Sequence, residues 1–143
     1  MARSKIDYGI DLGTTNSAIS RMENGETVIK KTAALKDTMS SCIRFRSNKS
    51  MQVGDSAYNG LGSDRLMNLK SPEEKKTNTF IEFKRTMGSD KSYFSEFMGK
   101  EYSSEELSSE ILKTLKSFVT DESIQAAIVT VPAKFTSNQK DAT

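Results

Sequence analysis

The chain has 143 residues, which is about the length of one domain with its own hydrophobic core. Its 21 basic and 19 acidic side chains are spread along the whole sequence, so no basic stripe for nucleic acid and no acidic tail stands out. Histidine is absent and Cys42 is the single cysteine, which excludes histidine-based catalysis, histidine-ligated metals and an intrachain disulfide.

The sequence also bears on the cellular location of the protein. No apolar run approaches the ~18 residues of a membrane span, and the N-terminus lacks the apolar core of a signal peptide. One unpaired cysteine also fits a reducing environment. We therefore expect a cytoplasmic protein with no membrane contact.

An apolar strand with a single carboxylate opens the readable part of the chain, in the stretch 8–17. We expect Asp11 to be buried between Ile10 and Leu12, where an ionised carboxylate needs a partner such as a cation. The short loop after the strand offers backbone N–H groups and hydroxyls that suit phosphate oxygens. Its residues are Gly13, Thr14, Thr15 and Asn16. The alternative is a strand end whose Asp caps its own turn, and this stretch alone supports both interpretations equally.

A hairpin follows this loop. Residues 18–22 alternate apolar and polar side chains, as a half-buried strand does, and Thr27–Ile29 forms a third strand. Between them, Asn24-Gly25 is a strong hairpin signal because both residues tolerate positive φ. The candidate phosphate loop thus lies between antiparallel strands, whereas a Walker-type loop leads from a strand into a helix.

The middle of the chain is less regular. Short strands are predicted over 43–46 and 51–53, and a helix is predicted to start at Asp55 and continue to about Leu66. Residues 71–76 read as a charged, solvated connector.

A short helix is predicted over 79–87. Thr79 and Glu82 have capping-box spacing, apolar residues recur at helical intervals, and Gly88 ends the helix. Lys84 and Arg85 lie on this helix among aromatic neighbours. Such side chains usually extend their charges to solvent, and that is the expectation here without further context.

The clearest helix is predicted from about Glu105 to Val119. Ser103 and Glu106 have capping-box spacing at its start. One apolar stripe runs along it, through Leu107, Ile111, Leu115 and Phe118. Such a stripe predicts a helix packed on the core.

The last predicted strand covers 126–131, and its nearly continuous apolar sequence indicates burial on both faces. Pro132 ends it, since proline cannot donate to the ladder. Thr136 and Gln139 then have capping-box spacing for a helix that runs out at Thr143. Because a chain seldom stops one turn into a capped helix, we expect a fragment of a longer protein.

Three stretches carry a family resemblance: residues 9–17, 78–88 and 127–135. Their order and spacing resemble the start of the ATPase domain of the 70-kDa heat-shock chaperones, the DnaK family, over nearly the whole chain. The first stretch by itself resembles the wider actin, sugar-kinase and chaperone superfamily.

The resemblance implies an α/β fold with a mixed sheet, namely lobe I of an actin-like, ribonuclease-H-like ATPase, truncated at its C-terminus. Residues 1–37 and 105–143 would form the core subdomain, and residues 38–104 a smaller α+β subdomain inserted into it. ATP or ADP with Mg²⁺ would lie between this lobe and a second one.

Site roles are also implied by the resemblance. Asp11 would face Mg²⁺ through water, since Mg²⁺ keeps much of its hydration shell. Thr14, Thr15 and Asn16, beside Gly13, would donate to the β- and γ-phosphates. Lys84 would reach the γ-phosphate and the attacking water, which makes Lys84 and Asp11 the catalytic candidates.

Pro132 and Lys140 match positions that relay nucleotide state to the substrate-binding domain. The family usually has Arg at the second of these, and Lys140 cannot make a planar two-pronged contact. Lys134 and Thr136 also stand where Tyr and Asn are usual, and Met39-Ser-Ser41 replaces Thr-Pro-Ser. These departures make ATP binding a firmer expectation than interdomain coupling.

The implied function is an ATP-dependent chaperone of the stress response and protein folding, with client polypeptides and co-chaperones. The chain alone is predicted to be inactive as an ATPase. One alternative is a chaperone-like protein that binds nucleotide without turnover, and a second is a small-molecule kinase of the same superfamily. A ribonuclease-H-type nuclease would need more convergent carboxylates. An open edge on the strand ending at Val131 further predicts self-association.

Overall fold

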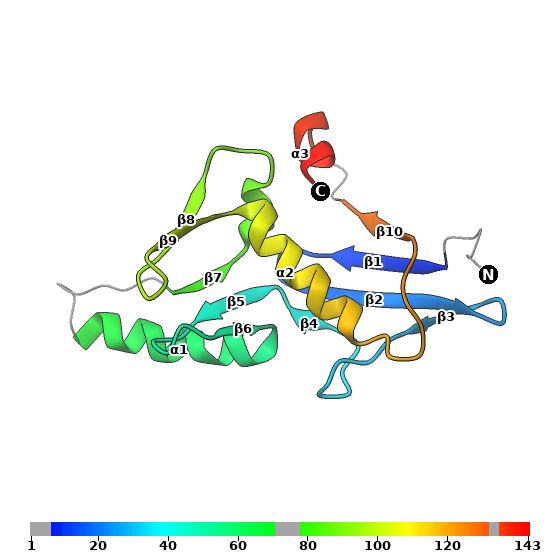
Figure 1. Ribbon diagram of the computed structural model, residues 1–143, viewed down its shortest axis with the longest axis horizontal. Helices are drawn as coiled ribbons and strands as arrows, with labels where there is room; N and C mark the ends of the chain where they lie inside the picture. Colours follow the sequence, from blue (N-terminus) through cyan, green and yellow to red (C-terminus); the bar gives the residue numbers. More distant parts are fainter. Residues whose placement is uncertain (1–6, 71–77, 132–134) are drawn as a thin grey trace.

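The computed structural model describes residues 7–70, 78–131 and 135–143 as a mixed α/β fold with three sheets (Figure 1). The elements in chain order are β1 (Tyr8–Leu12), β2 (Asn16–Glu23), β3 (Glu26–Ile29), β4 (Met39–Ser40), β5 (Cys42–Phe45), β6 (Met51–Val53), α1 (Asp55–Lys70), β7 (Thr79–Ile81), the 3₁₀ turn η2 (Phe83–Thr86), β8 (Ser92–Ser95), β9 (Lys100–Ser103), α2 (Ser104–Ser117), β10 (Ala127–Thr130) and α3 (Ser137–Ala142).

The largest sheet has the order β10-β1-β2-β3, with β4 also pairing to β2. β1 is antiparallel to β2 and parallel to β10, so the first and last strands of the chain lie side by side. Asn24 and Gly25 have φ of 51° and 82° and join β2 to β3. The predicted hairpin is therefore confirmed, and so is the position of the candidate phosphate loop between two antiparallel strands.

Helix α2 covers one face of this sheet (Figure 1). Leu107, Ile111 and Leu115 are at most 1% exposed and pack in one core cluster with apolar side chains of β1 and β2. At its start, the Ser103 hydroxyl accepts a hydrogen bond of 3.1 Å from the Glu106 N–H. The predicted core helix and its cap are confirmed.

The two smaller sheets lie to the left of α2 in Figure 1, away from the β2–β3 hairpin. Strands β6, β5 and β7 form one of them, with α1 packed against it, and β8 and β9 form a separate hairpin. Helix α1 begins at Asp55, as predicted, and extends to Lys70. Within the described ranges, no helix is long and apolar enough to cross a membrane.

The helix predicted over 79–87 is wrong in its first half. Thr79–Ile81 is a strand paired to β5, Glu82 has a left-handed φ of 54°, and only Phe83–Thr86 turns, as a 3₁₀ helix. The Thr79 hydroxyl donates to the Asp64 carboxylate of α1 instead of capping a helix. Pairing with β5 satisfies the backbone here, and this tertiary contact outweighs a short local pattern.

The prediction that the last strand is covered on both faces is also wrong. Alternate residues of β10 are exposed, and the Ile128 side chain is 61% exposed. The reason is that α2 packs on one face of the five-stranded sheet, while the opposite face is a shallow hollow of about 650 Å³. This hollow runs from Asp11 and Thr130 across β1 and β2 to Ile29 of β3.

Candidate functional site

The loop between β1 and β2 is a tight turn that requires glycine. A Cβ atom on Gly13 would come 2.0 Å from the carbonyl oxygen of Asn16, far inside van der Waals contact. Without that Cβ, the backbone doubles back within three residues and leaves Thr14 half-buried and Thr15 exposed. Four successive residues, Gly13 to Asn16, are therefore presented at one end of the sheet.

Two buried hydroxyls hold this loop from behind. The Ser41 hydroxyl donates to the Gly13 carbonyl at 2.8 Å and lies 2.7 Å from the Ser17 hydroxyl. Because Ser41 has one hydroxyl proton, Ser17 is the donor in the second bond. The Ser41 N–H also donates to the Thr15 carbonyl at 2.8 Å. These contacts fix both sides of the turn.

Asp11 lies beside this loop, but it is exposed and not buried as expected. Its side chain projects from the face of the sheet that α2 does not cover, so water can solvate the carboxylate. The neighbouring strand supplies one partner, since the Thr130 hydroxyl donates to Asp11 Oδ1 at 2.9 Å. An accessible carboxylate of this kind suits a hydrated Mg²⁺.

Lys84 reaches the same place from η2 and is 3% exposed. Its ammonium group donates to the carbonyl of Leu12, at the base of the loop, and to the carbonyl of Thr130 at 3.1 Å. The Phe135 ring lies 5.5 Å away, measured to its centroid. Burial lowers the pKa of Lys84, and the Asp11 carboxylate partly offsets this effect.

The expectation that this basic pair extends to solvent is therefore wrong for Lys84 and right for Arg85. The Arg85 side chain is 66% exposed and pairs with Glu82 at 3.7 Å. The difference arises because the 3₁₀ turn directs one side chain between the ends of β1 and β10 and the next one outward.

A small polar hollow of about 220 Å³ adjoins the loop at Asn16 and is bounded by the start of α1. On its wall, Asp55 accepts hydrogen bonds of 2.9 Å from Lys36 Nζ and from the Ser40 N–H. Both contacts lower the pKa of Asp55, and the Lys36 ammonium group has the larger effect. This ion pair joins the connection after β3 to the start of α1.

The candidate residues separate into two groups. Asp11, Lys84 and the loop from Gly13 to Asn16 meet at one end of the β1–β10 pair, although they come from distant parts of the chain. Lys140 lies on α3 with its side chain exposed. Pro132, the other relay candidate, lies outside the described residues.

The arrangement fits a phosphate group with a divalent cation on one side. It combines an exposed carboxylate, a loop with backbone N–H groups and hydroxyls, and a desolvated ammonium group. No cluster of three or more carboxylates, cysteines or histidines able to hold a metal occurs among the described residues. Such a cation would thus depend on Asp11, water and phosphate oxygens.

Sequence reasoning missed Ser17 and Ser41, the two hydroxyls behind the loop. The departure of Met39-Ser-Ser41 from the family pattern does not by itself indicate a contact with the loop. The contact of Ser41 with Gly13 spans 28 residues, so the sequence could not reveal it.

A family model for Hsp70 proteins matches residues 7–143. The chain belongs to the Hsp70 family. Members of this family bind ATP with Mg²⁺, and the matched region is consistent with part of a chaperone ATPase domain. The mixed α/β fold accordingly corresponds to an actin-like ATPase lobe.

Proposed function

We propose that this chain forms one wall of the nucleotide site in an ATP-hydrolysing chaperone. In this proposal, residues 1–37 and 105–143 are the core subdomain of a ribonuclease-H-like lobe I, and residues 38–104 are a subdomain inserted into it. The observation that carries the proposal is the position of Lys84, whose buried ammonium group binds the Leu12 carbonyl at the base of the phosphate loop.

Lys84 would act on phosphate as a pre-positioned charge. Two carbonyl oxygens hold its ammonium group, and little water reaches it, so its interaction with an incoming γ-phosphate is weakly screened. No reorganisation is needed when negative charge develops. Lys84 would thus stabilise the transferring group and orient the attacking water.

The loop and Asp11 would complete this wall. Thr14, Thr15 and Asn16 would donate hydroxyl, amide and backbone hydrogen bonds to the β- and γ-phosphates, while Ser41 keeps the turn rigid. Asp11 would orient the water shell of Mg²⁺. The cation supplies charge neutralisation of the phosphates when it is bound.

At the level of the parent protein, ATP hydrolysis would drive cycles of binding and release of client polypeptides, assisted by co-chaperones. Pro132 and Lys140 would relay the nucleotide state to a substrate-binding domain. Since a second phosphate loop and an adenosine pocket would be contributed by other residues, the 143-residue chain alone is expected to show no turnover.

A second candidate is a chaperone-like protein that binds nucleotide without turnover. The observation in its favour is Lys140, an ammonium group where a two-pronged guanidinium is usual. The small-molecule kinase is less well supported, because that function does not require Lys84 in η2.

The test compares Lys84→Met with Arg85→Met in the parent protein, by steady-state ATP hydrolysis and by calorimetric binding of ATP with Mg²⁺. Arg85 is the matched control, since it is the next residue and its exposed side chain faces away. We expect Lys84→Met to lower hydrolysis by about 10²-fold or more, as for removal of a transition-state donor, and Arg85→Met to leave it within about twofold.

Two outcomes of this test would contradict the first candidate function or the role of Lys84 in it. A wild-type parent that binds ATP but never hydrolyses it, with or without clients and co-chaperones, favours the second candidate. Equal effects of the two substitutions would contradict the proposed role of Lys84. A 15N-labelled sample of the 143-residue chain gives an independent check, because ATP with Mg²⁺ should shift the amide signals of residues 13–16 first.

A further inference from the structure

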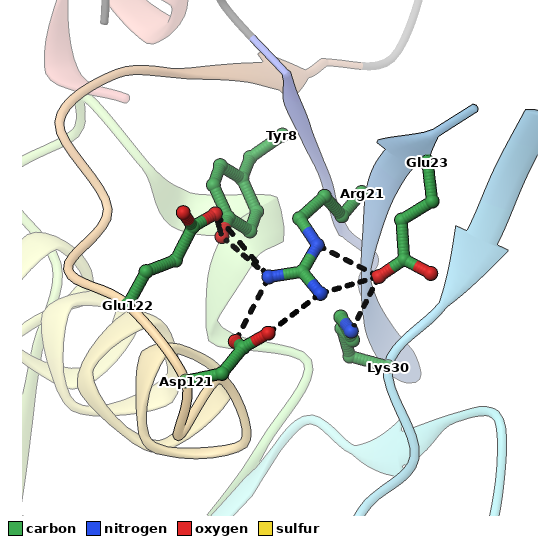
Figure 2. Close-up of polar contacts among 6 residues, drawn as sticks. All are labelled: Tyr8, Arg21, Glu23, Lys30, Asp121 and Glu122. Carbon is green, nitrogen blue, oxygen red and sulfur yellow. Dashed lines mark hydrogen bonds and ion pairs between the residues drawn. The ribbon is translucent and has the colours of Figure 1, made fainter. Parts of the chain in front are cut away.

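Figure 2 shows a dense polar cluster around Arg21. It includes Tyr8 at the start of β1, so it lies at the opposite end of the β1–β10 pair from Lys84, which binds the carbonyls of Leu12 and Thr130. Its side chains come from β1, from β2, from the residue that follows β3, and from the connection between α2 and β10. Its residues are Tyr8, Arg21, Glu23, Lys30, Asp121 and Glu122. The Arg21 side chain stands at the centre and is 11% exposed.

Every nitrogen of the Arg21 guanidinium has an acceptor. Nε donates to Glu23 at 2.8 Å, and Nη1 and Nη2 each donate to one oxygen of Asp121 at 2.8 Å. Nη1 also lies 3.2 Å from Glu122 and 3.3 Å from the Tyr8 hydroxyl. The two-pronged contact to Asp121 has the planar geometry that only arginine provides.

The cluster joins the sheet to a connection that leads directly into β10. Asp121 and Glu122 belong to the segment between α2 and β10, and Arg21 belongs to β2. Tyr8 of β1 adds a second link, since its hydroxyl donates to the Glu122 carboxylate. Opposite charges meet at the Arg21 link and a neutral hydroxyl donates to a carboxylate at the Tyr8 link, so the segment is held against the side of the sheet that α2 covers.

Strand β10 therefore has one anchor at each end. Tyr8 pairs with Ala127 near the cluster, and Asp11 pairs with Thr130 at the other end. Thr130 there gives its carbonyl to Lys84 and its hydroxyl to Asp11. The strand is four residues long, roughly 10 Å between its ends, so a shift at the cluster end moves the Thr130 end too.

We propose that Arg21 is a positioning residue: it clamps the α2–β10 connection through Asp121 and Glu122, sets β10 on β1, and thereby places Thr130 against Lys84 and Asp11. The placement of Thr130 stands on geometry alone, and only its consequence for phosphate binding rests on the proposed function. Arg21 touches neither Lys84 nor the phosphate loop directly.

The test uses Arg21→Met in the 143-residue chain, with Lys30→Met as the matched control. Lys30 belongs to the same cluster and its ion pair is with Glu23 at 2.8 Å; toward the α2–β10 connection it contributes only a coulombic attraction to Asp121, with no hydrogen bond or ion pair among the described contacts. Amide hydrogen exchange reports the pairing of β10, and NMR titration of the Lys84 side chain reports its surroundings. Neither measurement involves nucleotide, so failure of the proposed function would not affect either.

We expect Arg21→Met to speed amide exchange in residues 127–130 at least tenfold relative to the α2 core. We also expect the pKa of Lys84 to rise toward its ordinary value, since the released Thr130 end admits water. Lys30→Met should change both readouts much less than Arg21→Met does, because it removes only a coulombic attraction to Asp121. Arg21→Lys should restore only part of the protection, because an ammonium group cannot hold Asp121 with two bonds.

A purely structural role for Arg21 gives a different result. Exchange would then accelerate equally in β10 and α2, and the titration of Lys84 would stay unchanged. Either of these outcomes overturns the proposal. Should Arg21→Met fail to fold, Asp121→Asn is measured by the same two criteria, because it keeps the shape of the side chain and removes one charged anchor.

Discussion

At the scale of single residues, the site depends on what Gly13 lacks and on where Lys84 is buried. The missing Cβ lets the loop turn back on itself, and the hydroxyl of Ser41 holds the turn from behind. Lys84 supplies a positive charge that is almost fully enclosed. Each feature has a stability consequence that can be measured without any ligand.

Gly13→Ala should destabilise the chain by about 3 kcal/mol, because the new methyl group overlaps the Asn16 carbonyl and the turn must open. Gly62→Ala is the matched control. Gly62 lies in α1 with nothing within 4 Å of an added Cβ. Its replacement should therefore increase the free energy of unfolding by at most about 1 kcal/mol, because alanine has the higher helix propensity. Urea unfolding measures both. Equal effects would show that the loop does not need glycine.

Lys84→Met should change how stability depends on pH. The pKa of Lys84 is lower in the folded chain than in the unfolded chain, where it is near 10.5. Between the two values the unfolded chain binds more protons, so the wild-type free energy of unfolding should rise with pH across this alkaline window. Lys84→Met should lack that increment. Urea unfolding at several pH values up to 10.5 gives the free energy of unfolding as a function of pH. If the wild-type and variant curves run parallel, folding does not lower the pKa of Lys84.

At the scale of elements, helix α2 and the segment 79–87 show when a local pattern is decisive. Both begin with capping-box spacing. In α2 the cap forms and 14 residues follow with an apolar stripe, so local and tertiary preferences agree. In residues 79–87 the backbone pairs with β5 first, and Glu82 takes a left-handed conformation to leave the strand.

Ser103→Ala should cost about 1 kcal/mol, since it removes the side chain that accepts the Glu106 N–H at the start of α2. Ser109→Ala is a control in the same helix. Its hydroxyl only bonds back to the Glu106 carbonyl, and alanine is the better helix former, so its effect should be neutral or stabilising by a few tenths of a kcal/mol. Thermal unfolding of the two variants distinguishes a cap from a surface serine.

At the scale of the whole molecule, β10 ends the five-stranded sheet. It pairs with β1 on one side, and no strand of the described residues pairs with its other side. The strand carries no charge or proline, and Ile128 is exposed. An uncharged edge of this kind is a template for pairing with a second chain.

We therefore expect the 143-residue chain to self-associate with increasing concentration in sedimentation velocity. Ile128→Lys should suppress this association, because a charge on an edge strand opposes pairing. Leu66→Lys is the control, since it removes an exposed apolar side chain from α1 instead. A wild-type chain that stays monomeric at all concentrations would refute the expectation.

The sequence by itself determined the parts governed by neighbouring residues. The Asn24-Gly25 hairpin follows from two residues that accept positive φ, and α2 follows from its cap and apolar stripe. The Gly13–Asn16 loop between antiparallel strands follows from the same local chemistry. That chemistry left a phosphate site and a capped strand end equally open, and the family resemblance, which the Hsp70 match bears out, favoured the phosphate site.

Only the tertiary structure decided the rest, because those features depend on contacts between distant residues. Lys84 is buried because η2 directs it between the ends of β1 and β10, which are 72 and 46 residues away along the chain, respectively. Asp11 is exposed because α2 covers only the other face of its sheet. The Arg21 cluster joins residues about 100 positions apart. Charge pairing over such separations leaves no periodicity or spacing in the sequence.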